Sequence, residues 1–403
     1  MRLLLRRSLH FAALRSASAG TTRRALLAGA LSAPFVTPAR AADIDVAVIG
    51  AGVAGFAAAQ TLMAQRKSVV VLEARERTGG RVFTDTAPGI PFDQGAPTKP
   101  LPTGLSLMIN GKEISHEDYQ RFAKHADETG RILQALRKEA PGVDPRLVIR
   151  TADALEKLAL AEALRRVPFA PLQRLPVTDG KLPVRLNSRV IRLDSTGPLV
   201  KLVTPVGDVL ARAVIVTVPA GVLAAGGLGF APPLRGERLA AIASLPMVQA
   251  DKVCVTFSRK VLDAPDDTRV LAWSEKQTVI EALLRPGGRE AAILTYRGEE
   301  ARQLEAGGAS AAAAGAVSAL AELFGKEVRK AFLRAASTRW GLDPFARGAW
   351  AEGPAAARAV LAAPHSERVL FAGEATDPSG GVAGANASGH RAAREALAVL
   401  GKS

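Results

Sequence analysis

The sequence contains a single cysteine, Cys254, so it can form neither an intramolecular disulfide nor a multi-cysteine zinc site. It has only five histidines, and their positions (10, 116, 125, 365 and 390) show no spacing typical of metal ligands. Aromatic residues make up 4% of the chain, which leaves few rings for stacking nucleic-acid bases. We therefore expect no metal site and no nucleic-acid partner.

Long apolar runs are also missing. No stretch approaches the roughly 20 uninterrupted apolar residues of a membrane span, so stable membrane insertion is not expected. Nearly half of the net charge of +15 comes from residues 1–41, which hold seven arginines and no acid. The other 46 basic and 38 acidic residues leave a charge of +8 that forms no basic cluster. With 48% hydrophobic residues among 403, the chain is long enough for one large domain or two interleaved ones.

Residues 1–41 have the order of an export signal. Arg23 and Arg24 precede a modest apolar run at 25–36, and Ala39-Arg40-Ala41 offers small residues at the spacing that a signal peptidase accepts. The paired arginines resemble the bacterial twin-arginine type, which predicts a periplasmic or secreted protein. A mitochondrial transit peptide is the alternative, because the first twenty residues are basic and contain serines. Either interpretation removes this segment from the fold.

A nucleotide-binding pattern follows. The β-branched run 44–49 predicts a buried strand, the alanine-rich stretch 56–65 a helix, and 68–73 a second strand that ends in Glu73. The loop Gly50-Ala51-Gly52-Val53-Ala54-Gly55 joins the first strand to the helix. A glycine-rich loop alone is a weak signal, but between a strand and a helix, with an acid after the next strand, it is a strong one.

Each position in this pattern has its own physical reason. Gly50 permits the tight turn, Gly52 lets the backbone approach a pyrophosphate, and Gly55 allows close packing of helix on strand. The helix N-terminus offers N–H groups to the phosphates, and Glu73 can accept hydrogen bonds from a ribose 2′-OH. The turn 77–81 adds two arginines that can clamp phosphate oxygens, although alone it would be interpreted as a solvated basic turn.

The rest of the chain predicts a discontinuous nucleotide domain, because nucleotide-type strands lie at both ends. Residues 99–179 favour helices and loops. Strands are expected at 189–193, 199–203, 209–218, 250–257, 268–273, 291–296 and 368–372, and helices near 309–324 and 385–400. The predicted nucleotide-binding domain comprises residues 43–98, 180–246 and 340–403. The predicted substrate domain comprises residues 99–179 and 247–339. The expected class is α/β, a Rossmann-like domain interleaved with a smaller α+β domain.

Four stretches together resemble the flavin-dependent amine oxidases, the group that contains monoamine and polyamine oxidases. They are the glycine loop and 77–81 turn with Phe92-Asp-Gln-Gly-Ala96, the segment from Ala213 to Pro233, Asp251-Lys252-Val253, and the segment from Trp340 to Ala392. The resemblance spans most of residues 43–400 and suggests a compact bacterial member of the family. It implies FAD rather than a nicotinamide nucleotide.

The resemblance also implies which residues bind FAD. Glu73 would hold the adenosine ribose, Arg81 would lie near the pyrophosphate, and the backbone of Val190 would meet the adenine. Glu374 would face the ribityl–phosphate stretch, and Val382 would direct backbone N–H groups of the last helix at the flavin ring. The full predicted set is Gly50, Gly52, Ala54, Gly55, Glu73, Ala74, Gly80, Arg81, Gly95, Val190, Trp340, Gly373, Glu374 and Val382.

Two residues are predicted to be catalytic. Lys252 matches the family lysine that reaches flavin N5 through a water, although a lysine at the start of a strand is ordinarily solvated. Trp350 matches one aromatic wall of a cage for the substrate amine, although tryptophan more often packs in a core. The opposite wall corresponds to Gly381, which has no side chain. Ala349 replaces the cysteine that attaches flavin in some monoamine oxidases, so non-covalent FAD is expected.

The leading hypothesis is an FAD-dependent amine oxidase. Hydride would pass from the carbon next to a small-molecule amine to flavin N5, giving an imine, and O2 or another acceptor would take the electrons, with H2O2 as the product of O2. Desaturation or oxidation of a non-amine substrate is the first alternative, because one fold serves many chemistries. The second is a degenerate, non-catalytic flavin-binding protein, which Gly381 and the short stretch 177–184 motivate. A homodimer is left open.

Overall fold

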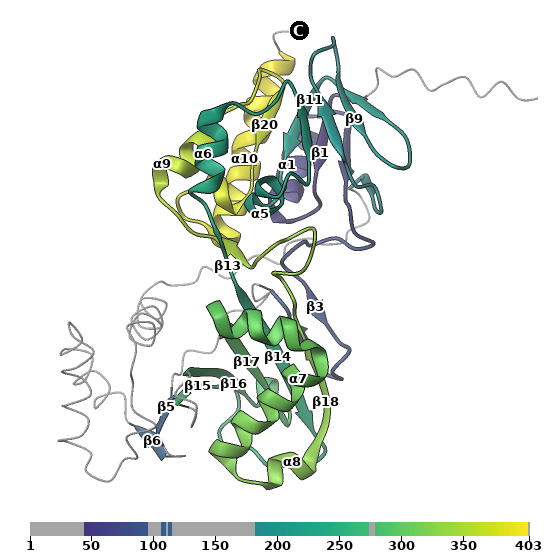
Figure 1. Ribbon diagram of the computed structural model, residues 1–403. Helices are drawn as coiled ribbons and strands as arrows, with labels where there is room; N and C mark the ends of the chain where they lie inside the picture. The colour runs from purple at the N-terminus through teal and green to yellow at the C-terminus, as the bar shows by residue number, and fades with distance from the viewer. Residues whose placement is uncertain (1–43, 96–105, 110–111, 115–181, 274–278, 402–403) are drawn as a thin grey trace, which may run out of the picture. The chain divides into compact units, whose positions relative to one another are not determined.

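The computed structural model describes residues 44–95, 106–109, 112–114, 182–273 and 279–401 (Figure 1). The predicted export signal lies outside these residues, as does most of the predicted segment 99–179. What is described of that segment is two strands, β5 (Ser106–Ile109) and β6 (Lys112–Ile114), where the sequence favours helices and loops. All of the described residues belong to one unit of the chain, Ala41–Ser403.

A parallel sheet forms where the glycine-rich pattern predicts it. Its strands are β1 (Val46–Ile49), β2 (Val69–Leu72), β7 (Val184–Arg185), β11 (Ala213–Val216) and β20 (Val369–Phe371). The order is β20-β11-β1-β2-β7, and every neighbouring pair is parallel. Segments from both ends of the described chain therefore meet in one sheet, as the predicted discontinuity requires (Figure 1).

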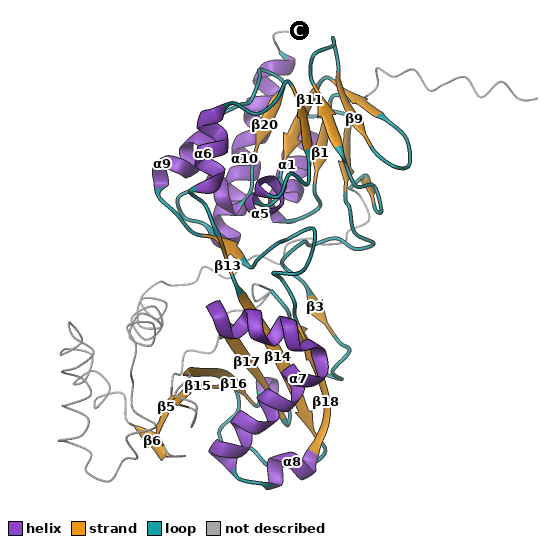
Figure 2. Cartoon of the chain, in the orientation of Figure 1, coloured by secondary structure: helices purple, strands orange, loops and turns teal. Residues whose placement is uncertain are grey.

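Both faces of this sheet are buried, which explains why its strands are almost uninterrupted apolar runs. The helices around it are α1 (Val53–Ala64), α5 (Ala220–Ala224), α6 (Gly236–Ala243), α9 (Ala355–Ala362) and α10 (Gly381–Leu400). Val48 packs in the core shared with α1 and α10, whereas its neighbour Ile49 packs in the core shared with α5, α6 and α9. Helices α1 and α10 run side by side (Figure 2).

A smaller four-stranded sheet also packs on the second face. It comprises β8 (Arg192–Asp194), β9 (Val200–Val203), β10 (Val209–Ala211) and β12 (Gly229–Ala231). The prediction of one strand over 209–218 is wrong, because the chain changes sheets at Arg212, between β10 and β11. The predicted strand 189–193 is also misplaced. The N–H of Ser188 donates to the Glu73 carbonyl oxygen at 2.7 Å, so this segment approaches the glycine-loop region before β8 begins.

A seven-stranded sheet carries the second half of the site. Beyond β5 and β6 its strands are β14 (Ala250–Phe257), β15 (Thr268–Trp273), β16 (Val279–Leu284), β17 (Ala291–Arg297) and β18 (Phe332–Ser337). The order is β18-β14-β17-β16-β15-β5-β6. The expected strands at 250–257, 268–273 and 291–296 are confirmed, whereas β16 and β18 were not recognised in the sequence. The domain boundaries stay a prediction.

Helices α7 (Gly298–Phe324) and α8 (Glu327–Ala331) cover one face of this sheet (Figure 2). Val253 and Leu294 of the sheet share a core with Leu320 of α7. By length and composition alone α7 would pass as a membrane-crossing helix, but a single helix of this kind is weak evidence, because helices in the cores of water-soluble proteins pass the same test. The expected helix 309–324 is its second half, beyond a kink at Gly308.

Two short antiparallel ribbons complete the described fold. The first pairs β3 (Thr84–Asp85) with β4 (Phe92–Asp93), and the second pairs β13 (Met247–Val248) with β19 (Trp350–Ala351). Trp350 lies opposite Val248 in the second ribbon, just before β14 begins. Both ribbons contribute residues to the cavity described next.

Candidate active site

A cavity of about 1190 Å³ lies against the carboxyl ends of β1 and β2 and one face of the seven-stranded sheet. This volume exceeds the roughly 300–1000 Å³ of ordinary small-molecule sites, so it has room for a dinucleotide together with a substrate. Every predicted site residue lines it except Gly55. We call the part formed by Gly50, Gly52, Glu73, Arg81 and Glu374 the nucleotide end, and the part formed by Lys252, Glu281, Arg297 and Trp350 the amine end.

The glycine loop opens the nucleotide end. Gly50 has a φ of +107°, and a Cβ there would lie 2.5 Å from Thr217 Oγ1. A Cβ on Gly52 would meet no atom within 4 Å, and this residue caps α1 without any side-chain hydrogen bond among the described residues. The N-terminus of α1 therefore faces open cavity with its positive dipole end, which fits a pyrophosphate.

Gly55 has a different task, since it lies behind the loop. A Cβ at Gly55 would lie 1.9 Å from the Gly50 carbonyl oxygen. The absence of a side chain therefore lets α1 pack directly on the turn that follows β1, in agreement with the reason predicted for the third glycine. Its absence from the cavity wall means that its contribution to cofactor binding is indirect.

Glu73 is buried at the end of β2, with 4% of its surface exposed. Its Oε2 accepts a hydrogen bond from the Ala51 N–H at 2.8 Å, and its Oε1 accepts one from the Arg75 N–H at 2.9 Å. The backbone thus fixes the carboxylate at the cavity. Each oxygen can accept a further hydrogen bond, which suits the paired hydroxyls of a ribose.

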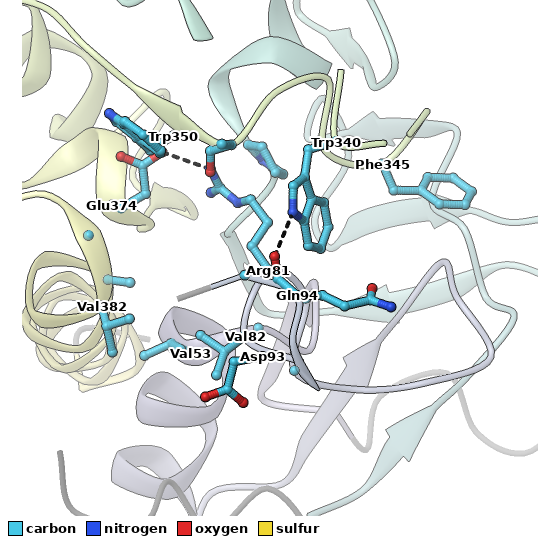
Figure 3. Close-up of a pocket in the computed structure, with 18 of the residues that line it drawn as sticks. Val53, Arg81, Val82, Asp93, Gln94, Trp340, Phe345, Trp350, Glu374 and Val382 are labelled. Carbon is cyan, nitrogen blue, oxygen red and sulfur yellow. Dashed lines mark hydrogen bonds and ion pairs between the residues drawn. The ribbon is translucent and has the colours of Figure 1, made fainter. Parts of the chain in front are cut away.

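Arg81 and Glu374 form the other side of the nucleotide end (Figure 3). Arg81 Nη1 donates to Glu374 Oε1 and to the Ala349 carbonyl oxygen, both at 3.0 Å, and the Ala351 N–H donates to the same Oε1 at 3.0 Å. Glu374 Oε2 is buried and accepts no hydrogen bond among the described residues, with Arg358 Nη1 3.7 Å away. A buried carboxylate oxygen left in this state fits a site that awaits a ligand hydroxyl.

Lys252 begins the amine end on β14. Its Nζ donates to the backbone carbonyl oxygens of Asp93 at 3.0 Å and Gly95 at 2.6 Å. The alternative of a solvated rim lysine is therefore wrong. Burial lowers the pKa of Lys252, while the carboxylates of Asp93 and Glu281 partly oppose this effect. A buried lysine with a depressed pKa can exchange a proton more readily near neutral pH than an exposed one.

The two predicted tryptophans differ in their surroundings. Trp340 is 5% exposed, and its Nε1 donates to the Gln94 carbonyl oxygen at 3.2 Å, so it is a fixed part of the wall (Figure 3). Trp350 is partly buried on β19, and its Nε1 donates to Glu352 Oε1 at 3.1 Å. The Cζ of Arg297 lies 5.4 Å from the centre of the Trp350 ring, so this aromatic face already holds a cation.

Strand register brings together charged residues that the sequence analysis missed. Lys252 lies opposite Thr295, which in turn lies opposite Glu281. Directly opposed residues project from the same face of a sheet, and all three line the cavity. Arg297, two positions after Thr295, projects to the same face, and its Nη2 donates to Glu281 Oε2 at 3.1 Å. The alternation of side chains along 291–297 could have indicated that Thr295 and Arg297 share one face. It could not have indicated which residues of other strands lie opposite them.

Gly381 lines the cavity at the first position of α10. Its φ is +53°, and a Cβ built on it would meet no atom of the described residues within 4 Å. The second wall of the predicted cage is therefore open space at this position. The same helix start carries Val382 into the cavity, across from Val53 of α1 (Figure 3). Two helix N-termini thus border one cavity, an arrangement that suits a ligand with anionic groups.

Comparison with known proteins agrees with this geometry. Residues 116–397 match the family model described as flavin containing amine oxidoreductase, and residues 48–103 match an NAD(P)-binding Rossmann-like domain. The chain is 27% identical over 452 residues to polyamine oxidase 4 of Oryza sativa, covering 92% of both proteins. It is 42% identical over 83 residues to putrescine oxidase of Kocuria rosea, 20% of this chain and 17% of that one. A solved putrescine oxidase triple mutant superimposes with a TM-score of 0.67 at 17% identity, over 90% of this chain and 100% of the other.

The chain therefore belongs to the flavin-containing amine oxidoreductases. The predicted α/β class with a Rossmann-like nucleotide domain is confirmed, as is the prediction of an FAD-dependent oxidoreductase that acts on amines. FAD also fits the cavity, which offers an uncapped helix start at Gly52, a fixed carboxylate at Glu73 and an unfilled acceptor on Glu374. The individual roles of the site residues stay predictions.

Proposed function

We propose that this protein oxidises a small-molecule amine at the carbon next to its nitrogen. The observation that carries the proposal is that Lys252 and Trp350 line the same cavity as the glycine loop and Glu73. Bound there without a covalent link, FAD would accept a hydride at N5 from that carbon and pass the two electrons to O2, so that imine and hydrogen peroxide are formed. The protein supplies orientation, electrostatics and protection from water.

The nucleotide end would hold FAD through groups that are already fixed. The first N–H groups of α1, beside Gly52, would bind the pyrophosphate, and Glu73 would bind the adenosine ribose. The backbone of Val190 would meet the adenine. Glu374 Oε2 would accept a hydrogen bond from a ribityl hydroxyl, and the first turn of α10 at Val382 would face the flavin ring. Ala349 offers no thiol, which supports non-covalent binding.

Lys252 would handle the proton at the amine end. A neutral lysine has two N–H donors and one lone pair, and both donors have carbonyl acceptors in Asp93 and Gly95. The lone pair is therefore the part of Nζ that remains to accept a proton from the substrate nitrogen or from a water. A substrate nitrogen must be unprotonated to expel hydride from its carbon, so a base with a depressed pKa at this place assists the reaction.

An anaerobic titration of the purified protein tests this proposal. We expect a yellow protein whose visible flavin absorbance is bleached by at least one amine, with hydrogen peroxide formed when air is readmitted. Matched compounds that carry a hydroxyl in place of the amino group should leave the absorbance unchanged. Bleaching by those compounds alone would support oxidation of non-amine substrates. Tight FAD binding without bleaching by any compound would support the non-catalytic interpretation.

We also propose export through the twin-arginine route, which carries folded proteins and so suits a protein that binds its cofactor first. The support is the order of Arg23-Arg24, an apolar run and Ala39-Arg40-Ala41. Replacing Arg23 and Arg24 by lysine should keep the protein inside a bacterial host, whereas replacing Arg6 and Arg7 should not. Export of both variants in equal amounts would contradict this route.

A further inference from the structure

The aromatic face of Trp350 is occupied by a side chain of the protein itself. Arg297, the last residue of β17, places its Cζ 5.4 Å from the ring centre. A guanidinium over an indole face satisfies the ring's attraction for cations. A substrate ammonium directed at the same face would therefore lie beside a permanent positive charge. This arrangement disfavours a simple amine held by its charge at Trp350.

The bonds of Arg297 leave part of its guanidinium available. One contact is with Glu281, from Nη2 to Oε2 at 3.1 Å. Its Nε–H is buried and has no hydrogen-bond acceptor among the described residues. The side chain is 24% exposed and lines the cavity, as does Glu281 at 22%. The Nη1 of Arg297 makes no hydrogen bond among the described residues and is not one of the buried atoms, so Nη1 can donate to an anionic ligand group in the cavity.

The charged groups around this position balance in sign, so the free donor of Arg297, rather than the net charge, is what favours an anion next to the reacting amine. Those that face one another across the sheet are Lys252, Glu281 and Arg297, with Asp93 beside Lys252. Glu281 is already paired with Arg297. Lys252 lies opposite Thr295, and Arg297 is two residues further along β17, about 7 Å away. Two long side chains that start this close on one face of the sheet can both contact a single small molecule.

We propose that the substrate is an amino acid, that is, an amine that carries a carboxylate, and that Arg297 binds this carboxylate. The proposal rests on the amine oxidation proposed above. The carboxylate accepts hydrogen bonds from the guanidinium, and the amino group and its carbon extend toward Lys252. Arg297 is thus a specificity-determining residue. A diamine would need Glu281 for its second ammonium, and that carboxylate is already held by Arg297.

Matched substrate pairs test the proposal with the holoprotein. Leucine and isoamylamine differ only in the carboxylate, as do phenylalanine and phenethylamine. The amino acids are used as racemates, so that both enantiomers are tested. We expect anaerobic bleaching of the flavin band to be at least about 10-fold more efficient with the amino acid of each pair. Binding of benzoate, followed by the perturbation of the visible spectrum, should weaken about 10–100-fold in Arg297→Gln.

Arg289→Gln is the matched control, because Arg289 also lines the cavity but is exposed, and removing it changes the net charge equally. It should shift benzoate binding less than about 3-fold. Glu281→Gln frees the guanidinium and should tighten benzoate binding. These measurements do not depend on turnover, and flavin content shows whether each variant folds.

Several outcomes would overturn the inference while leaving amine oxidation intact. One is faster bleaching by isoamylamine and phenethylamine than by the amino acids. Another is preferred bleaching by putrescine that Glu281→Gln abolishes, which would assign a second ammonium to this carboxylate. Unchanged benzoate affinity in Arg297→Gln would also overturn the inference. Failure of every amine and every amino acid to bleach the flavin would instead remove the proposed function itself.

Discussion

At the nucleotide end of the cavity, Glu73 is held by two backbone N–H groups, whereas at the amine end Glu281 is held by the side chain of Arg297. The first carboxylate and both of its donors lie between residues 51 and 75, around one βα turn. The second needs two strands of a sheet to be paired in one register. One end is therefore specified by local geometry, and the other by long-range pairing.

This difference has a functional consequence. Backbone donors cannot be exchanged by mutation, so the nucleotide end can keep one ligand while the rest of the chain changes. Side chains on β14, β16 and β17 can be replaced one at a time without disturbing the ladder hydrogen bonds. Substrate preference is accordingly expected to lie in residues such as Arg297 and Glu281, and cofactor preference in the turn after β1.

The largest effect is expected from adding one methyl group at Gly55. In Gly55→Ala the Cβ would lie 1.9 Å from the Gly50 carbonyl oxygen, so α1 must move off the turn. We expect a loss of about 1–3 kcal/mol in the free energy of unfolding and little or no bound flavin. Denaturant unfolding and the ratio of visible to ultraviolet absorbance measure the two. A fully loaded, equally stable variant would contradict the packing role.

Gly315→Ala is the control for this substitution. Gly315 lies within α7, and a Cβ there would meet no atom within 4 Å in the part of the chain that the structure describes. The alanine should stabilise the helix by about 0.5–1 kcal/mol and leave flavin content unchanged. The opposite signs of the two changes would show that the cost at Gly55 comes from close approach rather than from losing a glycine.

The next largest effect is expected at Lys252, on the rate of amine oxidation. Lys252→Met removes the proposed proton acceptor and should slow anaerobic bleaching by about 10²–10⁴-fold. Lys260→Met, at an exposed lysine beyond the end of β14, should leave the rate unchanged. A Lys252→Met variant as fast as the original protein would favour oxidation of a substrate that needs no such base.

The pH dependence of Lys252 gives an independent reading. Because burial lowers its pKa, the folded protein binds fewer protons than the unfolded chain between the depressed pKa and the ordinary value near 10.5. Stability from this residue therefore rises with pH across that window. The unfolding free energy of the original protein minus that of Lys252→Met should therefore rise with pH, and the bleaching rate of the original protein should rise as well.

A smaller effect is expected at Glu73. In Glu73→Gln one side-chain oxygen becomes an amide nitrogen, which cannot accept a hydrogen bond. One of the two backbone donors, the Ala51 N–H or the Arg75 N–H, therefore loses its acceptor. The charge that favours the ribose hydroxyls is lost as well, so the dissociation constant for FAD should rise about 10–100-fold. Titration of apoprotein with FAD, followed by flavin fluorescence, measures it. Glu76→Gln, at an exposed position in the same loop, should bind FAD normally.

The same contrast explains what the sequence could reveal. The first strand, α1, β2 and the position of the three glycines were predictable, because strand, loop and helix follow one another within 30 residues. The single strand expected at 209–218 failed because β10 and β11 are both apolar, and nothing in that run marks the change of sheet at Arg212. Chain order alone does not specify which sheet an apolar strand joins.

The amine end was only partly predictable for a related reason. Lys252 and Trp350 were found through a family resemblance, and the structure brings both to the cavity. Arg297 and Glu281 were missed, because a charged residue on an alternating strand is ordinarily interpreted as solvent-facing. Their pairing needs the register of β16 with β17, and β16 itself was not recognised.

The smallest effect is expected at Glu305 of α7, which holds the backbone that follows Trp340 in the cavity wall. Glu305 is 5% exposed, and its Oε1 accepts hydrogen bonds from the N–H groups of Gly341 and Leu342 at 2.6 and 3.3 Å, next to Trp340. Burial raises the pKa of Glu305, and the nearby Asp251 carboxylate raises it further. The stability that Glu305 contributes is therefore present at low pH and is lost as the pH rises through its raised pKa.

Glu305→Gln keeps an oxygen acceptor for these N–H groups but cannot ionise. The variant should match the original protein near pH 4 and exceed its stability by about 1 kcal/mol at pH 8, the scale of one hydrogen bond. Glu299→Gln, at an exposed position in the first turn of α7, should show no such gain with pH. A constant difference across this range would mean that Glu305 does not titrate there. Glu305 would then add no pH-dependent cost beside Trp340, and its two backbone donors would hold it as a fixed carboxylate, in the way that Glu73 is held at the nucleotide end.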